Sequence, residues 1–382
     1  MANLRNVAEL AGVPILTAYH ALTNGAPVEL DEEARARVRR AAGDLGYTLR
    51  ITIRDVAALA SVSVSTVSYV INANPLINVE TRRKVEAAIA ALGYRPNSTA
   101  RNLKASETRM IGYAWHRVQD VVQRNPILDR FLYEMAQTAE SRGYHVLTFA
   151  QAGPGEERLY TELSRTSRVD GFVLSDTTYD DPRIRKLQEL KVPFAAFGRA
   201  NPNWDFPFAD DDGQRGVGLV VEHLVAQGHS RIAMLGWPEG TVVGDIRARG
   251  YREALSAAGI DAPSYWLMRT VNDVSHATNA AAELLAAAAR PTAIICATDI
   301  IAIGVRAHLE QIGLKIGKDI AIASYDDTPV AVALGLTSVH QDIATIAKTL
   351  THILLAEIQG TPAPNRHVLV EPRLIVRESS TG

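Results

Sequence analysis

Short hydrogen-bonding side chains gather on one side of the segment 65–72, which reads STVSYVIN. Val67, Val70 and Ile71 fall on the other side, because apolar residues at i, i+3 and i+4 share one face of an α-helix. Hydroxyl, amide and aromatic groups on an outer face can contact the phosphates and base edges of DNA. The alternative is that these side chains are only the solvent-exposed polar surface of a helix. The outer residues are Ser65, Thr66, Ser68, Tyr69 and Asn72.

The neighbouring residues predict a helix-turn-helix that positions this face. Residues 56–60 form a short amphipathic pattern, and residues 61–63 read as a tight turn in which Ser63 can cap the next helix. Asn78 then caps a third helix with apolar residues at 85, 88, 89 and 92. Two short helices joined by such a turn place the second one in a DNA major groove.

The same apolar pattern occurs twice, at an offset of 49 residues. The stretch NVAELAGVPILTAYHAL begins at Asn6, and DVAALASVSVSTVSYVI begins at Asp55. The triplet LGY closes both copies, at 45–47 and at 92–94. Because the shared positions are mostly apolar, the repeated feature is a small three-helix core.

The first copy lacks the polar face of the second. Ile15, Leu16 and His20 stand at the outer positions, and Pro14 replaces the capping serine. We expect residues 1–47 to fold as a three-helix unit that reads few bases and serves as a packing or dimer contact. The alternative is contact with flanking DNA through the arginines of its third helix, Arg35, Arg37, Arg39 and Arg40.

Composition and charge favour a nucleic-acid-binding head on a larger body. The 382 residues have a formal net charge of −2, yet residues 51–108 carry seven Lys/Arg and four Asp/Glu, an excess of +3. The sequence shows no secretory signal and no apolar run long enough to cross a bilayer, so we expect a cytoplasmic protein. The single cysteine, Cys296, lies in an apolar run and is expected in the core.

From Met110 onward, short apolar runs alternate with helical patterns. Seven runs read as buried parallel strands, and helices are expected at 131–142, 216–227, 248–258, 277–289 and 300–311. This alternation predicts a doubly wound α/β architecture, whose ligands bind at the carboxyl ends of the strands. The polar candidates at these ends are Ser175, Asp176, Gly198, Arg199, Thr298, Asp299 and Asp326; the two aspartates Asp299 and Asp326 could instead only cap helices.

The stretch TIRDVAALASVSVSTVSYVIN, followed by VETRRKVEAAIAALGYRPNSTARNLKA, resembles the headpiece and hinge of the LacI family of bacterial repressors. The resemblance implies phosphate contacts at Thr52, Ser63, Thr66, Ser68 and Asn72. It implies base reading at Val64, Ser65 and Tyr69, and a hinge helix over 97–105 in which Leu103 wedges into the minor groove. Tyr69 stands where many members have Arg or His.

Residues 109–378 are similar to the effector domain of that family, which shares the periplasmic sugar-binding-protein fold. The segments RARGYREAL, ATDIIAIGV and IASYDDT carry this resemblance. It implies two subdomains joined by three crossings, near 206–208, 334–339 and 369–372. The implied effector contacts are Phe131, Ser175, Arg199, Arg247, Thr298, Asp326 and Gln341. Gly198 departs from the family, where an aspartate is frequent.

These observations predict an α + α/β protein: two tandem helix-turn-helix units, then a two-subdomain, doubly wound α/β domain. We expect a degenerate copy at 1–50, a DNA-binding headpiece at 51–96, a hinge at 97–108 and an effector and dimerisation domain at 109–382. The predicted function is a ligand-controlled repressor that binds a palindromic operator on double-stranded DNA as a homodimer, with a sugar as the expected effector. We expect no catalytic residue, metal, cofactor or membrane partner. The alternative is a sugar-acting α/β enzyme with an accessory DNA-binding head; a pure solute receptor would need a secretory signal.

Overall fold

The computed structural model of the chain describes residues 3–23, 31–71, 74–94, 107–116, 125–151, 157–287 and 289–381. Tertiary contacts divide the chain into two units, residues 1–106 and 107–382. Asn72, Leu103 and the hinge helix expected over 97–105 lie outside the described residues. Among the residues described, no helix is both long and apolar enough to cross a membrane.

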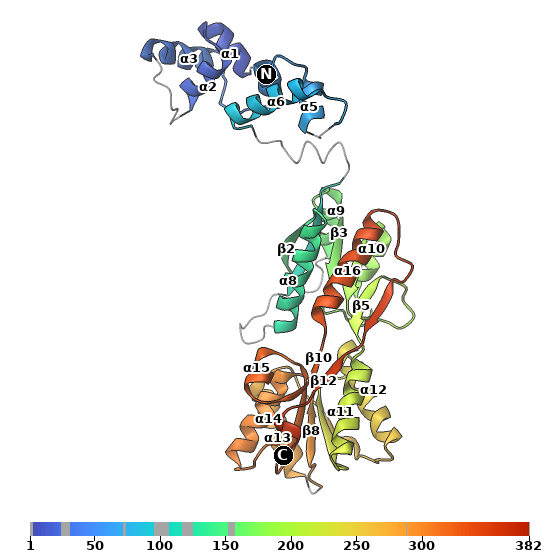
Figure 1. Ribbon diagram of the computed structural model, residues 1–382. Coiled ribbons are helices and arrows are strands. Elements are labelled where there is room, and N and C mark those ends of the chain that lie inside the picture. The colour runs from blue at the N-terminus through green and yellow to red at the C-terminus, as the bar shows by residue number, and fades with distance from the viewer. Residues whose placement is uncertain are drawn as a thin grey trace. The chain divides into compact units, whose positions relative to one another are not determined.

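The first unit consists of two three-helix bundles, one for each copy of the repeat (Figure 1). Asn78 caps the last helix as expected, because its side chain accepts a hydrogen bond of 2.8 Å from the Thr81 N–H. Most apolar positions that repeat in the sequence are buried in both bundles, whereas Leu10 and Leu45 of the first copy are exposed. The helices are α1 Leu4–Ala11, α2 Ile15–Leu22, α3 Glu32–Asp44, α4 Ile53–Leu59, α5 Val64–Ile71 and α6 Val79–Leu92.

The second unit has two six-stranded sheets, one for each of the two expected subdomains. All strands of the first sheet are parallel, in the order β11-β5-β4-β3-β1-β2. The strands are β1 Met110–His116, β2 His145–Gln151, β3 Gly171–Leu174, β4 Phe194–Phe197, β5 Phe208–Asp211 and β11 His367–Val370. The helices packed on them are α8 Pro126–Ser141, α9 Glu157–Arg165, α10 Pro182–Leu190 and α16 Ile343–Ile358.

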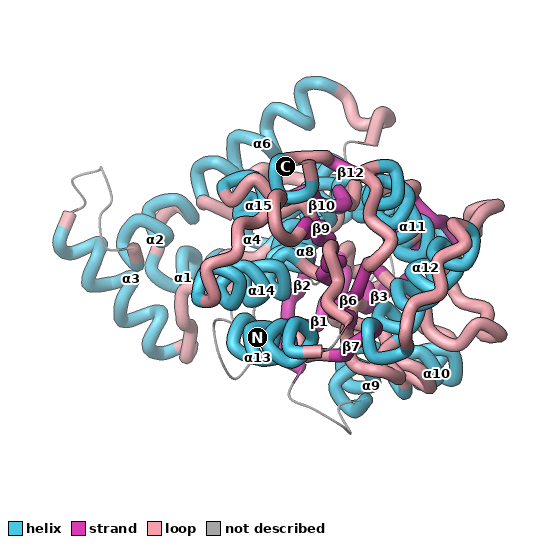
Figure 2. Tube along the Cα trace, turned by 90° about the horizontal axis from the view of Figure 1, so that it is seen from below, coloured by secondary structure: helices cyan, strands magenta, loops and turns pink. Residues whose placement is uncertain are grey.

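The second sheet has the order β12-β10-β9-β8-β6-β7, and only β12 runs antiparallel to its neighbour. Figure 2 shows α11 and α12 on one side of its strands, and α13 and α14 on the other. The strands are β6 Ile232–Gly236, β7 Leu267–Arg269, β8 Ala293–Cys296, β9 Ala321–Asp326, β10 Thr337–His340 and β12 Arg373–Ile375. The helices are α11 Gly213–Ala226, α12 Val242–Ala257, α13 Val274–Ala286, α14 Asp299–Gln311 and α15 Pro329–Ala333, with short 3-10 turns at Ser264–Trp266 and Glu378–Ser380.

The predicted fold class is confirmed, and Cys296 lies in the core, where burial raises the pKa of its thiol. The chain passes between the two subdomains at 211–213, 340–343 and 370–373. The third crossing agrees with the sequence expectation. The first two crossings were expected too early, near 206–208 and 334–339. The short strands β5 and β10 keep the chain in its subdomain until residues 211 and 340.

Candidate functional site

Helix α5 exposes the face that the sequence predicted. The Val64 and Tyr69 side chains are 42% and 51% exposed, whereas Val67 and Val70 are buried in the core of the first unit. Ser65 is exposed, and Thr66 and Ser68 are partly exposed. The helix therefore presents apolar, hydroxyl and phenol groups to solvent from one rigid element.

Two side chains predicted to contact phosphate fix the helix starts in this structure. The Ser63 hydroxyl accepts a hydrogen bond of 3.0 Å from the Thr66 N–H and lies 2.8 Å from the Thr66 hydroxyl. The Thr52 hydroxyl donates to Asp55 Oδ2 at 2.7 Å, so its proton is used inside the protein. Ser63 thus caps α5 as expected, while Thr52 retains only its oxygen lone pairs for a partner.

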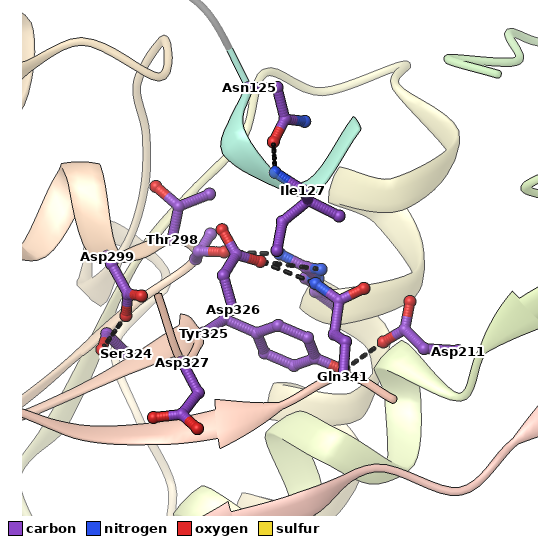
Figure 3. A network of polar contacts seen from close by, with 12 residues as sticks. Asn125, Ile127, Asp211, Thr298, Asp299, Ser324, Tyr325, Asp326, Asp327 and Gln341 are labelled. Carbon is purple, nitrogen blue, oxygen red and sulfur yellow. Dashed lines mark hydrogen bonds and ion pairs between the residues drawn. The ribbon is translucent and has the colours of Figure 1, made fainter. Parts of the chain in front are cut away.

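A cleft in the second unit brings three of the seven predicted effector residues together. Arg247, Asp326 and Gln341 line a cavity of about 70 Å³, and Figure 3 shows Asp326 and Gln341 pointing toward each other. The Gln341 amide donates to Asp326 Oδ1 at 2.7 Å. The other lining residues are Asn125, Ile127, Leu128, Asp176, Thr177, Phe197, Gly198, Asp210, Asp211, Trp237 and Val243.

Arg247 is the central cation of this cleft. It is 4% exposed; its guanidinium lies 3.6 Å above the Tyr325 ring, and its Nη2 atom lies 3.9 Å from Asp326 Oδ1. Its Nη1 group donates to the Ala297 carbonyl. Its Nε–H is buried with no hydrogen-bond partner, and so is the indole N–H of Trp237. Buried donors are rarely left unpaired, so these two lining groups indicate where a ligand supplies acceptors.

A group of buried acids faces Arg247 across the cleft. Asp211 accepts a hydrogen bond from the Tyr325 hydroxyl, which links the first subdomain to the second (Figure 3). Asp210 forms an ion pair of 2.8 Å with Arg199. Burial and the Asp211 carboxylate nevertheless raise the pKa of Asp210 to about 7, because together they outweigh the attraction of Arg199. Burial also raises the pKa of Asp326 well above its ordinary value, despite Arg247.

We predict that Asp210→Asn changes how stability varies with pH. Between about pH 4 and pH 7 the native chain keeps a proton on Asp210 that the unfolded chain has released, so this group makes the protein less stable as pH rises through that window. The wild type should therefore lose thermal stability relative to Asp210→Asn between pH 5 and pH 8. Melting curves of both proteins measure this difference, with the exposed Asp261→Asn as the matched control. A difference that stays constant with pH contradicts the prediction.

The other four predicted effector residues lie beside the cavity and do not line it. Phe131 is fully buried and stacks on Phe197, with 4.6 Å between ring centroids. The Ser175 hydroxyl pairs with that of Tyr113 at 3.0 Å. Arg199 reaches Asp210, and Thr298 caps α14 while donating to Asn272 Oδ1 at 2.6 Å. Of these four, Phe131 and Arg199 contact lining residues, Phe197 and Asp210.

Asp299 neither lines the cavity nor caps α14, because the N-cap of that helix is Thr298. Its carboxylate accepts hydrogen bonds from Ser324, Ser338 and Thr328 and is buried at the start of α14. This arrangement ties the ends of β9 and β10 to the helix. Within the described ranges, no group of three or more His, Cys, Asp or Glu side chains is placed to hold a metal ion.

Comparison with known proteins assigns the family. A family model described as "Bacterial regulatory proteins, lacI family" matches residues 52–97, and one described as "Periplasmic binding protein-like domain" matches residues 221–380. The HTH-type transcriptional repressor PurR of Mannheimia succiniciproducens is 30% identical over 334 residues, which are 86% of this chain and 98% of that repressor. The chain belongs to the LacI family.

Two similar solved structures contain bound ligands. A lac repressor dimer bound to operator and to the anti-inducer ONPF is 27% identical, with a TM-score of 0.77 over 87% of this chain and all of that one. A complex of the transcriptional regulator CelR with cellobiose is 28% identical, with a TM-score of 0.67 and the same coverage. The family match at 52–97 falls on the second copy of the repeat.

Sequence reasoning missed several lining residues of this LacI-family cleft. Trp237 follows the last residue of β6 by one position, so the rule that ligands bind after strand ends could have found it. Asp210 and Asp211 end β5, a four-residue strand with two acids that does not look like a buried strand. Asn125 and Ile127 begin α8 and carried no signal in the sequence.

Proposed function

We propose that this LacI-family protein is a sequence-specific transcriptional repressor that binds a palindromic operator and responds to a sugar or a related small molecule. One observation supports it above the others: a single chain carries both an exposed polar helix, α5, and a separate polar cleft with two unpaired buried donors. The first element suits DNA and the second suits a small ligand.

The charge of the cleft favours a neutral, hydroxyl-rich effector. Four of the five charged lining residues are aspartates, and the fifth is Arg247. An anionic effector would find only Arg247 as a countercharge in this set, whereas hydroxyl groups can donate to the carboxylates and accept from the Arg247 and Trp237 N–H groups. The CelR relative holds cellobiose, a ligand of the same chemistry.

Effector entry requires the cleft to widen. A volume of about 70 Å³ is far below the ~300–1,000 Å³ of pockets that enclose drug-sized ligands. The Asp211–Tyr325 hydrogen bond joins the two subdomains beside the cavity. A ligand that separates or re-forms such contacts shifts the balance between subdomain arrangements, which is the physical requirement for ligand control.

The functional assembly in this proposal is a homodimer in the cytoplasm, without catalytic activity. A headpiece of this size reads one half of a palindrome, so two copies are needed for the whole site. The lac repressor relative binds its operator as a dimer. Sedimentation at micromolar concentration checks this assembly, and a monomer there contradicts it.

The proposed function is tested by selecting DNA and then ligands with the full-length chain. Selection from random duplexes should enrich a two-fold symmetric site, bound with an affinity that falls steeply as salt rises. A thermal-shift screen of sugars and nucleosides should then find a ligand that raises the melting temperature and changes the affinity for that site. Failure to enrich any duplex contradicts the proposal, and turnover of a screened sugar supports the enzyme alternative.

A further inference from the structure

The two helix-turn-helix copies share one core. A single cluster of buried side chains contains residues from α1–α3 and from α4–α6, and the bundles lie side by side in Figure 1. The backbone N–H of Leu4, in the first copy, donates to Asp55 Oδ1 of the second at 3.1 Å. Leu4 is 0% exposed and Asp55 1% exposed, so this bond is shielded from water.

Asp55 differs from its counterpart in a way that suits this contact. Its other oxygen accepts from the Thr52 N–H at 2.8 Å and from the Thr52 hydroxyl at 2.7 Å, so one carboxylate holds the starts of α1 and α4 together. At the matching position of the first copy, Asn6 accepts from the Asn3 N–H of its own bundle. The copy in which donors from two chain segments converge has an aspartate at this position, and the other copy has an asparagine. Hydrogen bonds to a carboxylate are stronger than those to an amide.

The connection between the copies is packed. Tyr47, Leu49 and Ile51 are partly buried against the shared core, while Thr48 and Arg50 between them are exposed. Alternate residues of an extended segment point to opposite sides, so this connection lays one side along the core. Such a packed segment restricts motion between the two bundles.

Helix α2, the counterpart of the reading helix α5, faces its own chain. Ile15, Leu16 and His20 are only partly exposed, whereas their three counterparts in α5 are all exposed. Helix α2 contacts α6, and the Tyr19 hydroxyl lies beside Gly93, where α6 ends. Much of the face that would enter a groove is therefore used inside the first unit. The exposed counterparts are Val64, Ser65 and Tyr69.

We propose that the N-terminal copy is an intramolecular brace for the DNA-reading copy, so that each chain offers one reading helix and not two. Its interaction partner is α4–α6 of the same chain. Arg35 and Arg37 of α3 form surface ion pairs with Glu32 and Glu33, which offset the positive charge that this helix offers to phosphate. Arg39 and Arg40 are both exposed, and they are the residues through which the first copy would contact flanking DNA in the competing role.

Matched substitutions in the full-length chain separate the two roles. In duplexes enriched by the wild type, Tyr69→Ala should weaken binding by about tenfold or more, the scale of one lost base contact. His20→Ala, at the same position of the first copy, should change affinity by less than about twofold. Replacing Arg39 and Arg40 by serine should leave the salt slope of binding unchanged, because a brace contacts no phosphate. Each phosphate contact that was lost would lower the slope by ~0.9. A changed base preference in His20→Ala, or a shallower salt slope in the double serine variant, overturns the brace.

Hydrogen exchange tests the brace without DNA. Tyr19→Ala should raise exchange at the α6 amides, which belong to the other bundle, while Leu10→Ala, at an exposed first-copy residue, should leave them unchanged. Equal α6 exchange in Tyr19→Ala and wild type overturns the brace. If the wild type binds no duplex at all, the proposed repressor function fails, and this exchange experiment still decides the role of the first copy.

Discussion

Arg247→Ala is expected to lower effector affinity by about 5- to 150-fold, the equivalent of ~1–3 kcal/mol for polar groups left without a partner. The substitution removes the cation above Tyr325 and the charge that faces Asp326. It also removes the unpaired Nε–H that the ligand is expected to satisfy. Arg247→Lys should recover only part of this loss, because an ammonium group cannot reproduce the planar stack on Tyr325.

Calorimetric titration with a ligand from the thermal-shift screen measures this effect. The matched control is Arg249→Ala, an exposed arginine two positions along the same helix, which should bind the ligand like wild type. Operator binding in the absence of ligand should persist in both variants, which shows that the fold is intact. A ligand that binds wild type and Arg247→Ala equally well places the effector site elsewhere in the chain.

Local patterns were sufficient to predict the helices of the DNA-reading copy, but not every element around the cleft. The spacing of Val67 and Val70 identified the inward face of α5, and the side-chain chemistry of Ser63 and Asn78 identified two helix starts. These features depend on residues within one or two turns. The first two subdomain crossings were misplaced because β5 and β10 have four residues each and polar or charged ends, which make them resemble loops.

The residues that line the cleft were harder to predict, since each side chain of a neighbouring helix can face either the cavity or the core. Phe131 and Ile127 lie one turn apart on α8, yet only Ile127 lines the cavity while Phe131 packs behind Phe197. Helical spacing cannot distinguish these two positions. Similarly, the pairing of Asp211 with Tyr325 joins residues 114 positions apart, and no local signal specifies such a contact.

Gly250→Ala is expected to be the most destabilising of these substitutions. A Cβ at Gly250 would lie 2.3 Å from the Gln214 carbonyl oxygen and 2.9 Å from its Cα atom, so the added methyl group meets backbone of α11. Backbone cannot rotate away, and α11 and α12 must move apart. Overpacking of this kind costs about 1–3 kcal/mol, and contact with main chain places it at the upper end. Because Arg247 lies one turn earlier on α12, the displacement also carries its guanidinium away from Tyr325.

Gly218→Ala in α11 is the matched control for this clash. Its Cβ would meet only the Arg215 Nη1 atom, at 3.8 Å, which is an ordinary contact. Since alanine favours a helix over glycine by about 1 kcal/mol, this variant should be as stable as wild type or slightly more stable. Thermal melting of the two full-length variants, followed by titration with the effector, should show a lower melting temperature and weaker binding for Gly250→Ala alone. If both variants melt together, close approach of α11 and α12 is not what holds Arg247 in the cleft.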